Sequence, residues 1–173
     1  ACLIAQTIAP GFNRDFVSEE WNIMPPNIYD ELRDEADRMA DYDKEIEVYA
    51  SDIDPEMVEI AKRNAEEVGL GDIIQFNVKD VNTLTIDSEG PVALVGNPPY
   101  GERIGDREEV EEMYRYIGSL MKQHPYLSTY ILTSNKEFEY LVNRKATKRR
   151  KLFNGYIECT YYQYWGKKPD FKN

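Results

Sequence analysis

The sequence predicts an α/β protein with a mostly parallel sheet, and two observations carry this prediction. From residue 46 onward, short apolar runs rich in β-branched and aromatic residues alternate with segments of helical periodicity. Strands that alternate with helices are typical of a parallel sheet with helices on both faces. The last apolar run is interrupted by Asn154 and Gly155, a strong hairpin signal. We therefore expect a C-terminal antiparallel hairpin at one edge of the sheet.

Five apolar runs are the expected strands, because each has the length and composition of a strand and ends at polar or turn-forming residues. They cover residues 46–54, 73–81, 91–97, 128–135 and 149–165. With the helices between them, and a short connection after Val81, they give the order β-α-β-β-α-β-α-β-β.

Helical spacing of apolar residues predicts helices in residues 27–40, 54–70, 107–124 and 134–142. In the second of these, Asp54 suits the N-cap, Pro55 the first helical position and Gly69 the exit. In the last, Ser134 and Glu137 have the spacing of a capping box.

The composition fits one domain of 173 residues that can bury a core, and it carries a formal net charge of −11. An acidic chain does not hold a phosphate backbone over its whole surface, because such binding depends on Lys and Arg. One local exception is the run 144–151, in which six of eight residues are basic. It is either a solvated turn before a strand or an edge that faces nucleic acid.

The cellular setting is predicted from what the sequence lacks. There is no apolar run of about 18 residues, so we expect no membrane-spanning helix. Cys2 and Cys159 make neither a metal cluster nor a disulfide framework, so we expect a cytoplasmic protein without a metal.

Acidic side chains follow the first two expected strands, at the edge of a parallel sheet where ligands bind. Asp52 could accept hydrogen bonds from both hydroxyls of a ribose, since Asp54 is needed as the helix cap. Asp80 could accept from the exocyclic amine of an adenine. Together they suggest a pocket for an adenosine group. The alternatives are that both aspartates near residue 52 are loop acids and that Asp80 is a turn residue.

The third expected strand ends in Asn97, Pro98, Pro99 and Tyr100, and this motif suits a nucleobase with an amino group. The Asn97 side-chain oxygen and the Pro98 carbonyl are acceptors in a stiff frame, so they fit the two protons of an NH₂ group. Tyr100 offers a ring on which a base could stack, worth about 1–3 kcal/mol. Such a constellation would hold an extruded base by its amine. The alternative is a rigid turn after a buried strand.

This motif resembles the Asn/Asp-Pro-Pro-Tyr/Phe signature of class I S-adenosylmethionine-dependent methyltransferases that methylate amino groups. The longer stretches GNPPYGERIG, SDIDPEMVEIAKRNAEEVGL and IAPGFNRDF are more specific. They resemble the bacterial THUMP-domain RNA methyltransferases, which modify guanine N2 in large-subunit ribosomal RNA. The resemblance covers nearly the whole chain.

The resemblance implies a Rossmann-like class I methyltransferase fold, S-adenosylmethionine as cofactor and RNA, ribosomal in origin, as partner. The residues that it matches to the base-holding, catalytic positions are Asn97, Pro98, Pro99 and Tyr100. The residues that it matches to the cofactor site are Asp52, Ile53, Asp80, Val81 and Asn97. The neighbouring Gly101, Glu102 and Arg103 match the loop beside the active site.

The resemblance also implies what precedes residue 1. Family members have a Gly-rich turn that wraps the methionine part of the cofactor, just before the helix in which this chain begins. We therefore expect residues 1–173 to be a C-terminal catalytic domain that lacks its first strand, its Gly-rich turn and the RNA-binding THUMP domain. On this expectation, the isolated chain is inactive and binds cofactor poorly.

The expected reaction is in-line transfer of the sulfonium methyl group to the guanine amino nitrogen of 23S ribosomal RNA. Two alternatives stay open. Adenine N6 in DNA or RNA also presents two amino protons, so the motif does not separate it from guanine N2. A catalytically inactive scaffold with a nucleotide-binding fold is the third hypothesis.

Overall fold

A computed structural model describes residues 1–99 and 106–168 of the chain. The chain divides into two units, Ala1–Asp80 and Val81–Asn173, and each is described by itself. The order of the elements from residue 46 confirms the predicted β-α-β-β-α-β-α-β-β, with a short 3-10 helix as the connection after β2.

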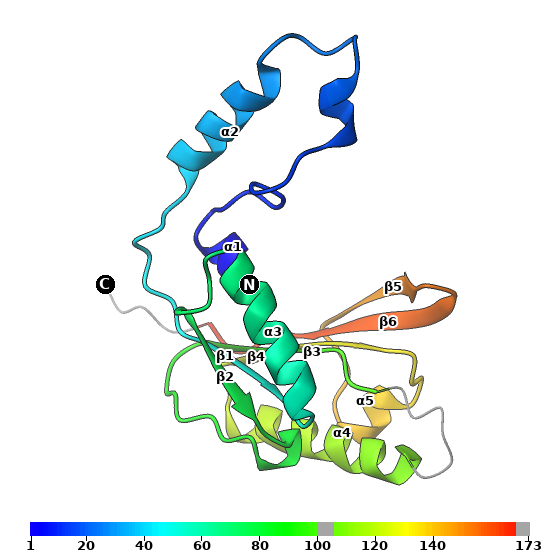
Figure 1. Cartoon of the computed structure of the whole chain (residues 1–173). Coiled ribbons are helices and arrows are strands. Elements are labelled where there is room, and N and C mark those ends of the chain that lie inside the picture. The colour runs from blue at the N-terminus through cyan, green and yellow to red at the C-terminus, as the bar shows by residue number, and fades with distance from the viewer. Residues whose placement is uncertain (100–105, 169–173) are drawn as a thin grey trace. The chain divides into compact units, whose positions relative to one another are not determined.

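The first unit contains α1 (Cys2–Ala5), η1 (Val17–Glu20), α2 (Ile28–Met39), β1 (Val48–Asp52), α3 (Pro55–Glu67) and β2 (Ile74–Val78). The second contains η2 (Val81–Thr83), β3 (Val92–Gly96), α4 (Asp106–Gln123), β4 (Leu127–Thr133), α5 (Phe138–Leu141), β5 (Lys148–Asn154) and β6 (Ile157–Tyr164). Figure 1 shows both sets of elements along the chain.

In the first unit, β1 and β2 form a parallel pair and α3 connects them. The predicted start of this helix is confirmed, because Asp54 is the N-cap and its side chain accepts a hydrogen bond from the Glu56 N–H. Gly69 has a φ of +73°, the left-handed conformation that suits a helix exit. The buried side chains of this unit include Cys2, Ala65 and Leu70, and residues of β1 and β2 pack against them.

The helix predicted in residues 27–40 is confirmed as α2, but its apolar stripe is largely exposed. Leu32 is 50% and Met39 62% exposed. A salt bridge links the helix to the preceding segment instead, since Arg33 of α2 pairs with Glu19 of η1. The Arg33 hydrogen bond and a second one from the Phe16 N–H hold the pKa of Glu19 below its usual value.

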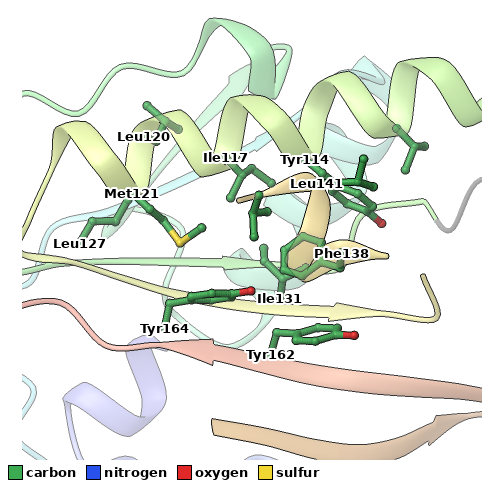
Figure 2. Close-up of a cluster of buried hydrophobic side chains, with 12 residues drawn as sticks. Tyr114, Ile117, Leu120, Met121, Leu127, Ile131, Phe138, Leu141, Tyr162 and Tyr164 are labelled. Carbon is green, nitrogen blue, oxygen red and sulfur yellow. The ribbon is translucent and has the colours of Figure 1, made fainter. Parts of the chain in front are cut away.

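The second unit is a four-stranded sheet in the order β3-β4-β6-β5. β3 and β4 are parallel, and β6 lies antiparallel to both β4 and β5. This confirms the predicted parallel pairing and the C-terminal hairpin at one edge. In Figure 2, α4 lies over one face of this sheet and points a row of apolar side chains at it.

The core of the second unit confirms the apolar stripe predicted for residues 107–124. Tyr114, Ile117, Leu120 and Met121 of α4 are all buried. Phe138 of α5 completes this core, and its ring meets the edge of Tyr114 with the centroids 4.8 Å apart. The helix also approaches the chain after α5 closely, since a Cβ added to Gly118 would lie 2.5 Å from the Val142 carbonyl oxygen.

Two local predictions were wrong. The capping box of Ser134 and Glu137 does not form, because the Asn135 side chain accepts from the Glu137 N–H and α5 begins only at Phe138. Asn side chains bond the backbone two residues on readily, which competes with a helix start.

The hairpin turn is also shifted by one residue. Asn154 pairs with Ile157 at the end of β5, so the two loop residues are Gly155 and Tyr156 instead of Asn154 and Gly155. Gly155 supplies the positive φ that this turn requires, at +60°. The hairpin itself is present as predicted.

Within the described ranges 1–99 and 106–168, no helix combines the length and the apolar surface needed to cross a lipid bilayer.

Candidate functional site

The residues predicted for the site fall into both units of the chain. Asp52, Ile53 and Asp80 belong to the first unit, and the residues from Val81 to Pro99 to the second. Tyr100 and the neighbouring Gly101, Glu102 and Arg103 lie outside the described residues. The predicted residues of each unit are therefore described within that unit.

The predicted residues of the first unit lie where β1 and β2 end. These strands are parallel, and Asp52, the last residue of β1, is the pairing partner of Val78, the last residue of β2. Beyond them, the Lys79 N–H donates to the Asp52 carbonyl at 2.9 Å. The structure therefore brings the Asp52 and Asp80 segments to one edge of the first unit, as predicted.

The two aspartates of the β1–α3 loop have different local roles. Asp52 Oδ1 accepts from the Asp54 N–H at 2.9 Å, and Asp54 Oδ1 accepts from the Glu56 N–H at 2.8 Å. Asp54 is thus occupied as the cap of α3, while Asp52 stands exposed at the strand end. A carboxylate has about four lone-pair sites, so one backbone contact leaves Asp52 the capacity to accept from two ribose hydroxyls.

Ile53 supplies an apolar surface directly beside this carboxylate. Its side chain is 69% exposed, although isoleucine is among the residues most often buried. An exposed aliphatic side chain next to an exposed carboxylate has the chemistry to contact the flat face of an adenine. The donor set and the apolar surface therefore fit an adenosine group.

Asp80 and Val81 follow β2 and are both half-buried. Asp80 is engaged in an interaction within the protein. Val81 opens η2, and its side chain packs against the hydrophobic core of the second unit. The predicted cofactor contact of Val81 would therefore involve its backbone, and the roles of both residues stay predictions.

The Asn97-Pro98-Pro99 segment of the second unit lies where β3 ends. Gly96, the last residue of β3, pairs with Ile131, two residues before the end of β4. Asn97 follows and is exposed, Pro98 is half-buried and Pro99 is exposed. The Asn97 side chain is thus exposed, and its predicted contact with a base requires this exposure.

A buried pair of hydroxyl groups links Pro99, the second proline after Asn97, to the core. Tyr114 Oη donates to the Pro99 carbonyl at 3.4 Å and lies 2.9 Å from Thr133 Oγ1. The Asn135 N–H donates to the same Thr133 oxygen at 3.1 Å. Tyr114 has a single proton, so a set in which it donates to Pro99 has the Thr133 hydroxyl donating to Tyr114.

This anchor stiffens the motif from the core side. Tyr114 and Thr133 are both fully buried and come from α4 and β4, the elements that pack against each other in this unit. Figure 2 shows the Tyr114 ring in the buried cluster beside Phe138. The Pro-Pro segment, whose φ angles are already fixed, is thereby linked to the buried core of the second unit.

The helical spacing of apolar residues in 107–124 is consistent with the buried position of Tyr114 but gives no sign of this anchoring role. The available signal was its hydroxyl group, since a buried tyrosine usually has a hydrogen-bond partner for its O–H. Which partner it has could not be read from spacing, because Thr133 and Pro99 lie on other elements.

We expect Tyr114→Phe to slow methyl transfer about 10-fold and to lower the free energy of unfolding by about 1–2 kcal/mol, since it removes a buried hydrogen bond and loosens the motif. Urea unfolding and single-turnover methylation by the complete gene product measure the two effects. The control is Tyr116→Phe on the same helix, which removes the hydroxyl that donates to the Leu84 carbonyl at 2.8 Å. It should cost similar stability and leave the transfer rate unchanged; equal rate losses in both variants contradict the anchoring role.

Comparison with known proteins identifies a family. The RMKL-like methyltransferase domain matches residues 1–163 of the chain. Over 167 residues the chain is 53% identical to YpsC of Bacillus subtilis (strain 168), which is named as a candidate RNA methyltransferase. It is 37% identical over 166 residues to ribosomal RNA large subunit methyltransferase K/L of Shewanella baltica (strain OS155 / ATCC BAA-1091).

Solved structures agree in fold. SMU.472, described as a candidate methyltransferase and solved in complex with SAH, superposes with a TM-score of 0.88 at 38% identity, over 98% of this chain and 45% of its own. A protein from Listeria monocytogenes str. 4b F2365, named as a predicted N6-adenine-specific DNA methylase, superposes with a TM-score of 0.85 at 45% identity, over 96% of this chain and 42% of its own. The predicted class I methyltransferase fold is thereby confirmed.

The alignments cover nearly the whole of this chain but less than half of each relative. They include 96% of this chain and 43% of YpsC, and 93% of this chain and 23% of the K/L enzyme. Because the family match extends over almost all of the chain, the chain belongs to the RMKL-like methyltransferase domain family.

Proposed function

We propose that this domain methylates an exocyclic amino group of a nucleobase with S-adenosylmethionine, and that the acceptor is guanine N2 in 23S ribosomal RNA. The observation that carries the proposal is the exposed Asn97 at the end of β3, followed by a Pro-Pro segment tied to the buried Tyr114. A fixed amide acceptor at the end of a parallel strand suits the capture of an NH₂ group.

Two named relatives support the choice of RNA as the substrate. YpsC is named for RNA methylation and the K/L enzyme for methylation of large-subunit ribosomal RNA. The chain covers less than half of either protein. The proposal therefore concerns the complete gene product.

The cofactor proposal has support from a solved relative and from this chain. SMU.472 was solved with SAH, the product form of the cofactor. In this chain the exposed Asp52 carboxylate and the exposed Ile53 side chain suit a ribose and an adenine. We propose that Asp52 accepts from the ribose hydroxyls, that Ile53 contacts the adenine face and that Asp80 and Val81 lie beside the adenine edge. When bound, the cofactor supplies an electrophilic methyl group on a sulfonium sulfur.

The proposed chemistry of this chain is positioning. Asn97 Oδ1 and the Pro98 carbonyl each accept a hydrogen bond from one amino N–H, and Tyr100 stacks on the ring. The N–C bond forms as the S–C bond breaks, and one of the two amino protons is then released to water. Fixing both protons aims the nitrogen lone pair, and well-oriented reactants can lower a barrier by about 7–11 kcal/mol. As the amine becomes positive during attack, its N–H groups become stronger donors, so both acceptors bind the transition state more tightly than the ground state.

A second candidate is methylation of adenine N6 in DNA or RNA. One specific observation favours it, because the similar structure from Listeria monocytogenes carries the name of an N6-adenine-specific DNA methylase. Adenine N6 also has two amino protons, so the same two acceptors would serve it. A non-catalytic scaffold is the third candidate.

Transfer of label from tritiated S-adenosylmethionine separates these candidates. The complete gene product is incubated with 23S ribosomal RNA or with DNA, and the labelled nucleoside is identified after digestion. We expect label in N2-methylguanosine from the RNA. Label in N6-methyladenine supports the second candidate, and demonstrated cofactor binding without label in any nucleic acid supports the scaffold.

A further inference from the structure

The β5–β6 hairpin, residues 148–164, which we term the hairpin arm, is the most basic and aromatic part of an acidic chain. Residues 148–164 contain four Lys and Arg residues and one Glu, and the flanking residues 140–147 and 165–168 add four more Lys and Arg residues and no acidic one. All seven residues of β5 are exposed. The charge of this region is therefore opposite to that of the chain as a whole.

Strand register places the end of the arm beyond the sheet edge that carries Asn97. β6 pairs with β4 only as far as Thr133 with Thr160, and Thr160 in turn pairs with Lys151 of β5. Past this level, β5 and β6 pair with each other for three more residues each and then turn. At about 3.4 Å per residue the arm extends about 10 Å past the end of β4. Figure 1 shows it as a two-stranded ribbon at its turn end.

The hairpin arm extends from the same edge of the sheet at which Asn97 follows β3. β3 and β4 are parallel, and Gly96 is level with Ile131, so Asn97 leaves the sheet at the same end as Thr133. β6 is antiparallel, and its first residues therefore lie at that end too. The free end of the arm and Asn97 consequently lie at the same edge of the second unit.

The basic side chains of β5 differ between its two faces. Arg149 is opposite Tyr162, on the face of the sheet that carries the core, and it pairs with Glu139 of α5 at 3.3 Å. Lys151 lies on the same face and pairs with Glu158, which lowers the pKa of that carboxyl group. On the other face, Lys148 and Arg150 form no ion pair with any carboxylate among the described residues.

Aromatic side chains stand at the free end of the arm. Phe153 is 64% exposed, and Tyr156 in the turn is fully exposed. The Lys151 ammonium lies 5.3 Å from the centre of the Phe153 ring. Basic side chains along a strand with exposed rings beyond them are the two components of single-stranded nucleic acid sites, in which cations track the backbone and rings stack on bases.

We propose that the hairpin arm binds the single-stranded RNA that flanks the target nucleotide, with Lys148 and Arg150 on phosphates and Tyr156 stacked on a base. This inference rests on the proposed function for the identity of the nucleic acid. It assigns an RNA-contacting surface to the methyltransferase domain itself, next to the edge at which the base is held. Charged residues on an edge strand also prevent strand-to-strand association, so that role is the alternative that the test must separate.

The roles of Lys148 and Arg150 are tested by the salt dependence of RNA binding. The complete gene product is used, with a single-stranded fragment of 23S ribosomal RNA as probe. Each neutralised phosphate contributes about 0.7 to the slope of log K against log salt for a single strand. We expect Lys148→Gln/Arg150→Gln to reduce the slope by about 1.4. The matched control is Lys62→Gln/Arg63→Gln, which removes the same charge from exposed positions of α3 and should leave the slope unchanged.

The role of Tyr156, in the turn of the hairpin arm, is tested by comparing two substitutions of this residue. Because the side chain is fully exposed, Tyr156→Ala should not affect folding, yet stacking on a base predicts a loss of RNA affinity of about 5- to 100-fold. Tyr156→Phe keeps the ring and should bind like the wild type. Both should retain wild-type affinity for S-adenosylmethionine.

The outcomes separate this inference from the proposed function. One outcome would overturn the RNA-binding role. The variants Lys148→Gln/Arg150→Gln and Tyr156→Ala would bind RNA with wild-type affinity and salt slope, and Lys148→Gln/Arg150→Gln would aggregate more, which assigns the charges to edge protection. If wild-type protein methylates no RNA, the proposed function fails, and equilibrium binding of the same RNA fragment still decides the role of the arm.

Discussion

Asn97→Ala should reduce the rate of methyl transfer about 10²- to 10³-fold while the affinity for S-adenosylmethionine is largely kept. The substitution removes one of two acceptors whose hydrogen bonds strengthen as the amine becomes positive, and loss of one such group has an effect of this size in other enzymes. Asn97 is exposed, so the free energy of unfolding should change by about 1 kcal/mol or less. Single-turnover transfer to RNA and calorimetric binding of the cofactor measure the two quantities.

Asn97→Asp is the matched control for this prediction. A carboxylate keeps an acceptor oxygen at the same place, and the signature that this motif resembles accepts either residue. We expect Asn97→Asp to retain more activity than Asn97→Ala. If Asn97→Ala transfers methyl groups at the wild-type rate, Asn97 does not hold the amine.

Asp52→Ala should weaken S-adenosylmethionine binding about 10- to 150-fold. Hydrogen bonds to a charged group contribute about 1.5–3 kcal/mol, and Asp52 is proposed to accept from the ribose. The transfer rate at saturating cofactor should fall much less, because the base-holding residues are unchanged. Isothermal titration of the complete gene product gives the dissociation constant, and cofactor-saturated kinetics give the rate.

Asp54→Asn is the control, because it tests the neighbouring acid of the same loop. Asp54 caps α3 through its bond from the Glu56 N–H, and asparagine caps a helix about as well as aspartate. This variant should therefore keep both stability and cofactor affinity. A larger loss of affinity in Asp54→Asn than in Asp52→Ala would reverse the roles of the two residues.

The parts of the fold that depend on local sequence were predictable. Asp54, Pro55 and Gly69 bound α3 as expected, because capping and left-handed exits depend on a few adjacent residues. The apolar stripe of α4 was identified by its spacing alone. The parallel pairs and the hairpin followed from the alternation of elements.

Other features depend on competition or on distant residues, and sequence reasoning missed them. The expected capping box does not form, because the Asn135 side chain instead of the Ser134 side chain accepts from the Glu137 N–H. The anchor of the Pro-Pro segment joins residues from α4 and β4 to Pro99, so no local pattern reveals it. The exposed stripe of α2 shows that helical periodicity predicts a helix but not what covers it.

For the site, the sequence correctly predicted that Asp54 caps α3, which leaves Asp52 as the aspartate of this loop that could bind a ligand. The structure shows Asp54 as a cap, Asp52 exposed at the end of β1 and Asn97 exposed at the end of β3. The contacts of these residues with a cofactor and a base remain predictions. They depend on ligands, whose positions no hydrogen bond within the chain reveals.

The central claim is that Asn97 holds the amine that receives the methyl group, and the most direct test is a crystal structure of the complete gene product with SAH and an RNA oligonucleotide that contains the target guanosine. We expect the guanine N2 atom to lie about 2.7–3.2 Å from Asn97 Oδ1 and at a similar distance from the Pro98 carbonyl oxygen. A bound guanine whose amine is held by other groups, with the Asn97 amide turned away from it, would contradict the account.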